Sequence, residues 1–561
     1  MATMATPHSV RSLVLCLAAP VALLTACADS PTEARPLADE AAQRRSGSMP
    51  TLQYSSPIPT LNSDRPSEVP ALYLAERIPG FGGLYFENRR LVVVLTSGGD
   101  ESIARKVLAA FVSDASEMVE PRVEAGSDIV IRNAEHSFLE LREWRDNISF
   151  WAFGLPAVVS TALSQRKNRI VIGIEDLSAG ATVEARLSQE DIPLEAVQIV
   201  KERRWRPNAG PLLSPPPPEN GPTLRDYRRP IEGGLILARL GNTPGTGCTF
   251  GFNAIQSSWA HAVTASHCSS QFAAMDGTYF FEEQAIEDST HFVGLEYHDP
   301  LPSGCGWWWC TKWRLSDATL LAVPAYVQVH QGYIARTMGS GSIMVDPANP
   351  TFRITRHALV VAEEDPVHMM GQYSGWQQGT VTDIKDIVGP RGVVLKDQAE
   401  ADYKAGEGNS GAPVFIRLGG DSVTLAGVHN GDNDEPVYSS YYRAYFSPLA
   451  NVMQDLGEFD ARAPAPPPPP PPVDVSILGP TQIKPEAICT WEAVVDPPGG
   501  TYSYAWYNDG ILAGTGQYYT GGKDPANQTD HFTVRVDVSG DGLGSQTITV
   551  YESPSAPFCF Q

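Results

Sequence analysis

The sequence has little positive charge and no long hydrophobic run beyond its first 24 residues. Of its 561 residues, 41 are Lys or Arg and 64 are Asp or Glu, so the formal net charge is −23. This excess of negative charge argues against nucleic acids and anionic lipid surfaces as partners. After residue 24 no stretch is long and apolar enough to span a bilayer, so we expect no transmembrane helix there.

Cysteine is also scarce. The chain has 8 cysteines, and no two of them stand in a Cys-x-x-Cys pair. Structural zinc sites are usually built from such pairs, so the cysteine spacing gives no sign of a metal site. We expect neither a metal nor any other cofactor.

The N-terminal segment has the features of an export signal. Arg11 precedes an apolar run over residues 13–24, which has the length of a signal core and is short for a spanning helix. The Leu-Thr-Ala-Cys at 24–27 resembles a bacterial lipobox, in which the cysteine becomes the lipidated first residue of the mature protein. We therefore predict a lipoprotein signal peptide over residues 1–26 and a lipid anchor at Cys27, on the extracytoplasmic side of a bacterial cell envelope. The alternative is an ordinary secretory cut that releases the protein.

Proline-rich stretches divide the chain. One run covers residues 215–218 and another covers residues 466–472, and both favour stiff polyproline II spacers. A chain of this length has room for three or four domains. The predicted organisation is a signal peptide (1–26), a flexible tether (27–67), an α+β region (68–205), a Pro-rich linker (206–230), a central domain (231–460), a polyproline linker (461–472) and a small β-sandwich (473–561).

The region between the tether and the first proline run alternates between β and α patterns. Short apolar runs predict strands, and apolar residues three and four apart predict helices. The expected strands are 91–95, 129–131, 169–174 and 196–200, and the expected helices are 101–115, 138–153 and 181–187. This alternation predicts an α+β or α/β sandwich.

Three motifs in the central domain carry residue types that can act together in catalysis. Ser410 lies in Gly-Asn-Ser-Gly, between glycines that let backbone N–H groups turn toward one point. A serine hydroxyl is a weak nucleophile and needs a base and an orienting group. His267 follows a hydrophobic strand in Thr-Ala-Ser-His-Cys, and Asp317 begins Asp-Ala-Thr-Leu-Leu. Taken singly, these residues could be a buried histidine, a turn aspartate and a small residue in a tight loop.

The order His267, Asp317, Ser410 and the flanking residues resemble the trypsin-like serine peptidases of the chymotrypsin fold. The resemblance covers residues 231–460 and implies an all-β domain of two barrels that meet at the site. It implies that Ser410 attacks a carbonyl carbon of a protein or peptide substrate, that His267 transfers the proton, and that Asp317 orients the imidazole. The N–H groups of Gly408 and Ser410 would form the oxyanion hole, where one donor is typically worth about 3–4 kcal/mol.

The same resemblance implies disulfide bridges. In this family a bridge closes the loop that carries the histidine, which corresponds here to Cys248–Cys268. Bacterial members have a second small bridge near the position of Cys305–Cys310. Export also favours disulfides over a metal site. Cys489 and Cys559 remain in the C-terminal region, and we predict that they join and pin the C-terminal tail.

Asn409, directly before Ser410, departs from the family pattern. Trypsin-like zymogens have an aspartate there, which pairs with the ammonium group of a newly formed N-terminus. Ile231 begins an Ile-Glu-Gly-Gly that resembles such a terminus, but a neutral amide cannot form the ion pair. We therefore expect other contacts to hold the oxyanion loop, and we do not expect cleavage to be required for activity.

The α+β region over 68–205 resembles, by its position, the pro-regions of secreted bacterial serine peptidases. Such a region can template folding of the peptidase and plug its cleft. The alternative is an independent binding or stalk domain.

The strand over 425–431 resembles a wall of the primary specificity pocket. Some bacterial glutamyl endopeptidases bind a glutamate side chain through a histidine in the setting of His429, so a weak preference for acidic residues is one hypothesis. Against it, Ala405, five residues before the nucleophile, lacks the hydroxyl that those enzymes often carry. Lys404 beside it supplies charge or points to solvent, and a purely structural His429 is the other interpretation.

The C-terminal residues 473–561 alternate as strands do, with turn signals between the runs, and predict a small β-sandwich. Trp506 in Tyr-Ala-Trp-Tyr resembles the core tryptophan of Ig-like or PKD-like modules of bacterial exoenzymes. Such a module implies binding to a surface or a glycan, or spacing alone.

Two functions fit these patterns. The first is a serine endopeptidase of the cell envelope that acts through an acyl-enzyme. The second is a non-catalytic surface-binding or adhesion protein on a degenerate protease scaffold. The intact set of His267, Asp317 and Ser410 favours the first, while Asn409 and the large flanking regions leave room for the second.

Overall fold

The computed structural model describes residues 65–87, 90–114, 129–207, 221–239, 247–282, 290–304, 311–465, 470–556 and 559. The chain divides into two units after Pro57, and every described residue belongs to the second unit. The predicted signal peptide, the anchor at Cys27, the bridge Cys305–Cys310 and most of both proline runs lie outside these residues. In the part of the chain that the structure describes, no helix is long and apolar enough to cross a membrane.

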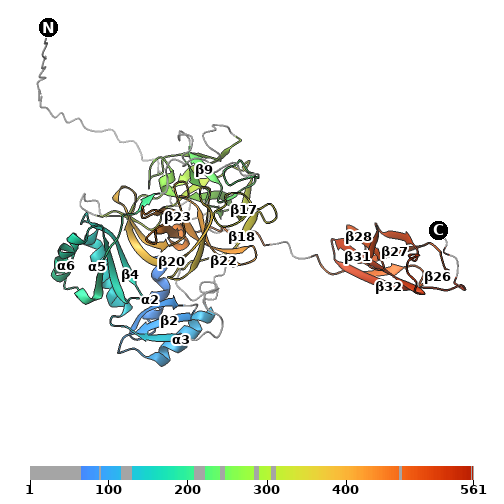
Figure 1. The fold of residues 1–561 in the computed structure, drawn as a ribbon, viewed down its shortest axis with the longest axis horizontal. Coiled ribbons are helices and arrows are strands. Elements are labelled where there is room, and N and C mark those ends of the chain that lie inside the picture. The colour runs from blue at the N-terminus through green and yellow to red at the C-terminus, as the bar shows by residue number, and fades with distance from the viewer. Residues whose placement is uncertain are drawn as a thin grey trace, which may run out of the picture. The chain divides into compact units, whose positions relative to one another are not determined.

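The N-terminal region (blue to teal in Figure 1) combines helices with two three-stranded groups of strands, β1-β2-β3 and β4-β5-β6. Its elements are α2 (Val69–Ala75), β1 (Phe81–Glu87), β2 (Arg90–Leu95), α3 (Glu101–Asp114), β3 (Val130–Asn133), α5 (Phe138–Ala152), β4 (Val158–Ser164), β5 (Arg169–Ile174), α6 (Gly180–Gln189) and β6 (Val197–Lys201). The predicted strands and helices are all present, with ends within two residues of those expected. Three elements were not predicted: α2, β1 and β4. Strand β1 contains two glycines and β4 mixes Ser and Thr with apolar residues, so neither shows a clear alternation.

Helix α5 shows how local sequence sets an element boundary. Ser137 precedes the helix, and its hydroxyl oxygen accepts a hydrogen bond from the Glu140 N–H at 3.3 Å. Glu140 in turn accepts one from the Ser137 N–H at 2.9 Å. This reciprocal pair satisfies two N–H groups that a helix start leaves unpaired. The buried face of the helix, which includes Leu141 and Ile148, packs on the core between α5 and strands β4 and β5.

The first half of the central domain is a seven-stranded antiparallel sheet in the order β10-β9-β13-β14-β16-β12-β11. Its strands are β9 (Ile236–Arg239), β10 (Cys248–Thr249), β11 (Phe252–Gln256), β12 (Trp259–Thr264), β13 (Tyr279–Phe281), β14 (Phe292–His298) and β16 (Thr319–Ala322). His267 lies just beyond the end of β12, and Asp317 lies two residues before β16. Because β12 and β16 are paired antiparallel, with Thr264 opposite Thr319, these two positions lie at the same edge of the sheet.

The second half of the central domain is a closed barrel. Strands β21, β24, β23, β22, β19 and β20 pair in turn, always antiparallel, and β20 also pairs with β21, which closes the ring. The ring strands are β19 (Pro366–Gly371), β20 (Gly375–Val388), β21 (Val394–Ala401), β22 (Pro413–Gly419), β23 (Ser422–Asp432) and β24 (Ala444–Pro448). The other elements of this half are β8 (Ile231–Gly233), β15 (Trp313–Arg314), β17 (Val329–Ala335), β18 (Thr351–His357) and α7 (Leu449–Leu456). Ser410 immediately precedes β22.

The N-terminal region is joined to this barrel by strand pairing. Strand β4 pairs antiparallel with β20, so that Thr161 lies opposite Asp386. Through this pair the strands β4, β5 and β6 extend the barrel sheet outward. The N-terminal region therefore shares a sheet with the central domain.

The predicted linker and tether are structured at their ends. Arg206 and Pro207 form β7, which pairs with β23, although the sequence pattern placed them in a linker over 206–230. Leu224, in the same predicted linker, is fully buried in the core of the central domain. Arg65, in the predicted tether over 27–67, is also buried. Each of these residues finds its partner far away in the sequence, which local composition does not reveal.

Arg65 binds two carboxylates of the barrel. Its guanidinium lies 2.7 Å from Asp386 on β20 and 2.5 Å from Asp397 on β21. Burial by itself would raise the pKa of Asp386, but the attraction and hydrogen bonds of Arg65 outweigh it and lower that pKa to about 2. The N-terminal region is thus attached by a buried ion pair as well as by a strand.

The C-terminal residues 470–556 and 559 form a β-sandwich (red in Figure 1) of two sheets, β25-β27-β30 and β26-β32-β31-β28-β29. Its strands are β25 (Asp474–Leu478), β26 (Gln482–Ile483), β27 (Cys489–Asp496), β28 (Tyr502–Asn508), β29 (Ile511–Thr515), β30 (Tyr518–Gly521), β31 (His531–Gly540) and β32 (Gly544–Glu552). Trp506 and Trp491 are fully buried at its centre, and Cys489 is bridged to Cys559. The core tryptophan and the bridge are those expected from the sequence.

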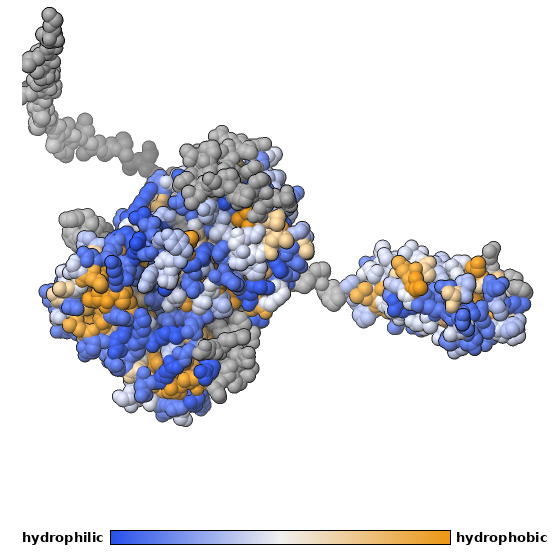
Figure 2. All heavy atoms as spheres, in the orientation of Figure 1, coloured by the Kyte–Doolittle hydropathy of each residue, from blue (hydrophilic) through white to orange (hydrophobic). Residues whose placement is uncertain are grey.

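Figure 2 shows a mainly hydrophilic face with small, separate hydrophobic patches. Single exposed apolar side chains are normal on soluble proteins and need no special explanation.

Candidate active site

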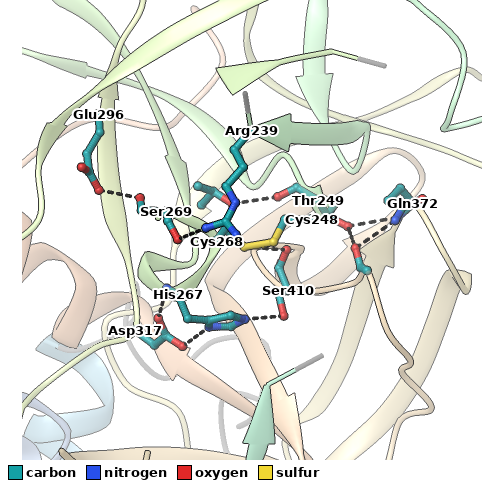
Figure 3. The surroundings of a disulfide bond; sticks show 12 residues. Arg239, Cys248, Thr249, His267, Cys268, Ser269, Glu296, Asp317, Gln372 and Ser410 are labelled. Carbon is teal, nitrogen blue, oxygen red and sulfur yellow. Dashed lines mark hydrogen bonds and ion pairs between the residues drawn. A yellow bond between two sulfur atoms is a disulfide. The ribbon is translucent and has the colours of Figure 1, made fainter. Parts of the chain in front are cut away.

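The structure brings His267, Asp317 and Ser410 together in one line of hydrogen bonds (Figure 3). His267 Nδ1 lies 2.5 Å from Asp317 Oδ2, and His267 Nε2 lies 2.7 Å from Ser410 Oγ. The backbone N–H of His267 also donates to Asp317 Oδ1 at 3.0 Å. The carboxylate therefore fixes the ring, and the ring presents its second nitrogen to the hydroxyl.

The backbone of Asp317 is held by a polar side chain of the barrel, which belongs to a hydrogen-bonded network. The Asp317 side chain is fully buried, and its backbone N–H donates to Ser447 Oγ at 2.9 Å. The Ser447 hydroxyl donates to Gln398 Oε1 at 2.8 Å, and Asn430 Nδ2 donates to the same oxygen at 2.8 Å. Such a connected network restricts the position of the Asp317 backbone. Sequence reasoning missed these residues because they come from three different barrel strands.

The bridge between Cys248 and Cys268 lies beside the site, with 6.2 Å between the Cα atoms (Figure 3). Cys268 directly follows His267, so the bridge ties the histidine turn to strand β10. The next residue of β10, Thr249, donates its N–H to the Ser410 carbonyl at 2.7 Å. One short strand thus positions both the histidine turn and the serine.

The loop before Ser410 has two backbone N–H groups without an internal acceptor. Among the described residues, no oxygen accepts from the N–H of Gly408 or of Ser410. The Gly408 carbonyl is turned the other way, and it accepts hydrogen bonds from Thr249 Oγ1 at 2.8 Å and Gln372 Nε2 at 3.2 Å. Gly408 has a φ of +100°, which favours glycine. This geometry leaves both N–H groups able to bind an oxyanion.

Gly411 is needed for close packing. Its φ is +89°, and a Cβ there would lie 2.1 Å from Thr264 Oγ1. The glycine lets the serine loop approach the end of the strand that carries the histidine. This contact explains one of the two glycines that flank Ser410 in the sequence.

Asn409 is held as a neutral amide. Its Oδ1 accepts from the N–H groups of Tyr373 and Ser374 at 3.1 and 3.2 Å, and its Nδ2 donates to Ser374 Oγ at 2.6 Å. Ile231 is buried within the continuous chain, and its N–H donates to Gln328 O at 2.8 Å. The turn at residues 373–374 thus holds the Asn409 side chain.

His429 is buried next to Tyr403. Its Nδ1 lies 2.9 Å from the Tyr403 hydroxyl, and burial, helped by the nearby His267, lowers the pKa of His429 to about 3. The ring is therefore neutral at neutral pH and offers no positive charge to an acidic substrate. Ala405, the other predicted pocket residue, is 3% exposed. His429 Nε2 is buried without a hydrogen-bond partner among the described residues, and the acidic preference stays a prediction.

Trp205, which the sequence gave no reason to select, covers His267. Its ring meets the His267 ring edge to face, with centroids 6.1 Å apart, and its Nε1–H donates to Asn430 Oδ1 at 3.2 Å. Trp205 directly precedes β7, which lies along the end of β23. Ser410 has no exposed surface, and the His267 side chain is 6% exposed. The site is therefore covered by the end of the N-terminal region.

No group of three or more His, Cys, Asp or Glu side chains arranged for a metal ion occurs within the described ranges.

Comparison with known proteins gives likenesses in structure only. No family model and no curated protein matches the sequence. A glutamic-acid-specific serine protease, described as using a histidine triad in substrate binding, is 17% identical over 40% of this chain and 96% of its own, with a TM-score of 0.29. Cellulomonas bogoriensis chymotrypsin and Thermobifida fusca protease A are each 17% identical over 42% of this chain and 99% of theirs, with TM-scores of 0.30 and 0.27. At these values we draw the chemistry from the geometry of the site alone.

Proposed function

We propose that this protein is a serine endopeptidase that hydrolyses peptide bonds of a protein or peptide substrate through an acyl-enzyme. The observation that carries the proposal is the line of hydrogen bonds from Asp317 through His267 to Ser410. Each group has the partner that its role requires: a base for the nucleophile and a carboxylate for the base.

In this mechanism His267 Nε2 takes the proton of Ser410 Oγ as Oγ attacks the substrate carbonyl. Asp317 stabilises the imidazolium, which then gives the proton to the leaving amine. Water attacks the acyl-enzyme in the second half of the reaction, and His267 again removes a proton and returns it to Ser410. The N–H groups of Gly408 and Ser410 bind the oxyanion in both halves, at about 3–4 kcal/mol for a donor.

The N-terminal region holds the cleft closed in this proposal, as a pro-region would. Its end at Trp205 covers His267, and β7 occupies backbone groups of β23 beside the site. An extended peptide bound to a sheet edge uses the same kind of backbone pairing. Two ion pairs, Arg203 with Glu435 and Arg206 with Asp434, hold the segment in addition. A substrate must displace this segment before it can reach Ser410.

The location and the outer parts of the chain complete the proposal. The Leu-Thr-Ala-Cys sequence supports a lipid anchor at Cys27 and an extracytoplasmic place in the cell envelope, with secretion as the alternative. The C-terminal sandwich would bind a surface or a glycan, or act as a spacer. Membrane fractionation of a Cys27→Ser variant tests the anchor, because a variant that stays with the membrane would rule it out.

Covalent labelling tests the enzyme directly. A small fluorophosphonate reacts with a serine only when a base activates it, and mass spectrometry identifies the labelled residue. We expect labelling at Ser410 in the full-length protein, loss of labelling in Ser410→Ala, and a strong decrease in His267→Ala. The competing function, a non-catalytic binding protein on this scaffold, predicts no labelling of the wild type, even after Trp205→Ala opens the cleft.

A further inference from the structure

The indole of Trp205 packs in a space that matches it closely. Its Nε1–H donates to Asn430 Oδ1 at 3.2 Å, and its ring meets the His267 ring edge to face. Gly431 makes room for the indole, because a Cβ at that position would overlap with Trp205 Nε1. Trp205 is 5% exposed, and Asn430 has no exposed surface. Both partners of this hydrogen bond are therefore shielded from water.

Gln398 fixes which way the Asn430 side chain must point. Gln398 Nε2 donates to two backbone carbonyls, one of them that of Leu315 at 2.8 Å, so its Oε1 is the acceptor on the other side. Asn430 Nδ2 and Ser447 Oγ both donate to this oxygen, each at 2.8 Å. An amide that presents its Nδ2 to Gln398 must turn its Oδ1 toward Trp205.

The same hydrogen bonds continue to the backbone of Asp317. Asn430 Nδ2 also donates to Ser447 Oγ at 3.1 Å, and Ser447 Oγ accepts from the Asp317 N–H at 2.9 Å. The Asp317 carboxylate in turn binds His267 Nδ1. A continuous series of hydrogen bonds therefore connects the indole of Trp205 with the residue that orients the histidine.

A cover over a polar network has to replace the water that it excludes. Among the described residues, no donor other than the Trp205 indole reaches Asn430 Oδ1. A buried amide oxygen without a donor is costly, so the amide would relieve the cost by turning or shifting. A turned amide would place its Oδ1 against the Gln398 oxygen and would no longer donate to Ser447.

We propose that Trp205 is a positioning residue for Asp317. Its indole N–H orients the Asn430 amide, and the amide keeps Ser447 in the position that binds the Asp317 backbone. This inference rests on the proposed function. It gives the end of the N-terminal region a second role, because the segment that blocks the substrate also keeps the groups of the site assembled. When a substrate displaces the segment, water can donate to Asn430 Oδ1 in place of the indole.

The test uses Trp205→Phe in the full-length protein and the rate at which a small fluorophosphonate labels Ser410. Phe keeps a ring over the site but has no N–H, whereas Ala opens space for the reagent and for water. A residue that only covers the site predicts a Trp205→Phe rate between those of the wild type and Trp205→Ala. We expect Trp205→Phe to be labelled about tenfold more slowly than the wild type, the scale of one hydrogen bond lost at a buried group.

A second substitution tests whether the effect passes through the network. Ser447→Ala removes the link between Asn430 and Asp317, so Trp205→Phe should no longer slow labelling in this background. An effect on access alone would change the rate by the same factor in both backgrounds. The matched control is Trp506→Phe in the sandwich, which removes an indole N–H that donates to a backbone carbonyl at 2.8 Å and should leave labelling unchanged.

The proton on His267 Nδ1 provides a readout that does not depend on access. A proton in a short hydrogen bond resonates at low field in the NMR spectrum, and it moves upfield when the bond to the carboxylate lengthens. We expect an upfield movement in Trp205→Phe and in Asn430→Asp, whose carboxylate cannot donate to Gln398 or Ser447. The second variant keeps the test decisive if Trp205→Phe does not fold.

The outcomes separate this inference from the proposed function. A Trp205→Phe rate at or above that of the wild type, or equal slowing in the Ser447→Ala background, overturns the positioning role but leaves the peptidase. A His267 signal that moves upfield in neither variant also overturns it. No labelling of Ser410 in the wild type or in Trp205→Ala removes the peptidase, and the positioning role with it.

Discussion

The N-terminal region and the C-terminal sandwich both flank the central domain, but they differ in where their structural partners lie. The N-terminal region pairs β4 with a barrel strand, inserts Arg65 between two barrel carboxylates and places Trp205 against His267. The sandwich draws its core from its own residues, 473–559, and closes it with the Cys489–Cys559 bridge. The N-terminal region is therefore stabilised by the central domain and contacts the site, whereas the core of the sandwich consists of its own residues.

This difference shows what kind of flanking region can control a site. A region that shares a sheet and a buried ion pair with the central domain can hold a cover over the candidate site, because the cover is anchored on rigid elements. A region whose contacts are internal has no such route through the described residues. The predictions below test the contrast, beginning with the largest expected effect.

Arg65→Met should cause the largest loss of stability. The change leaves the carboxylates of Asp386 and Asp397 buried without their main cation, and breaking a buried pair in this way costs about 3–5 kcal/mol. Urea denaturation measures the free energy of unfolding of the joined N-terminal and central parts, provided that the spectroscopic signal comes from those parts.

The matched control for this change lies in the sandwich. Arg535 pairs with Asp537 at 3.2 Å, where both side chains are about 40% exposed. Arg535→Met should cost less than about 1 kcal/mol, because exposed pairs are weak. Equal losses in the two variants would remove the distinction between a shared and a self-contained region.

Acid should loosen the N-terminal region in a defined pH range. The pKa of Asp386 is lowered from its ordinary value of 3.8 to about 2, because the ion pair with Arg65 outweighs the opposing effect of burial. A lowered pKa in the folded state means that the stabilisation is complete above about pH 4 and is lost as the pH falls toward 2. The shift corresponds to about 2 kcal/mol at the conversion of roughly 1.4 kcal/mol for each pKa step.

The measurement compares acid titrations of unfolding for the wild type and Arg65→Met. The variant lacks the cation that lowers the pKa, so it should lose less stability between pH 4 and pH 2. Parallel titration curves in this range would show that the ion pair is not responsible.

Trp205→Ala should uncover the site. Removing the indole deletes the contact with His267 and the hydrogen bond to Asn430, and we expect the fluorophosphonate to label Ser410 about tenfold faster. Trp259→Ala is the control, since Trp259 is 72% exposed and at the start of β12. An unchanged labelling rate in Trp205→Ala would show that the segment does not limit access.

The sequence was a good guide to elements with a strong local pattern. Strand β5 begins with a run of three β-branched residues, 170–172, and α5 has an amphipathic repeat, so both were predicted with nearly correct ends. The motifs around His267, Asp317 and Ser410 were equally informative, because they combine a required residue type with a required neighbour. Each of these signals lies within a few residues of sequence.

The remaining features depend on residues far apart in the chain. The pairing of β7 with β23 joins positions more than 200 residues apart, and nothing near Trp205 marks it as the cover of a site. The burial of His429 against Tyr403 is likewise set by tertiary packing.

Removing the sandwich should have the smallest effect. A chain that ends after residue 465 lacks every strand from β25 onward but keeps all the barrel strands, α7 and the segment to Arg462 that packs on the barrel. Because the sandwich core contains only its own residues, its loss opens no cavity in the central domain. We expect the labelling rate of Ser410 to stay within about twofold, and the unfolding free energy of the remaining part to stay within the roughly 0.5 kcal/mol typical of changes away from such features.

The isolated sandwich, residues 470–561 with its disulfide formed, should unfold as it does in the whole protein. A several-fold change in labelling after truncation would mean that the sandwich also acts on the site. The N-terminal region would then no longer be the only flanking part with an effect on Ser410.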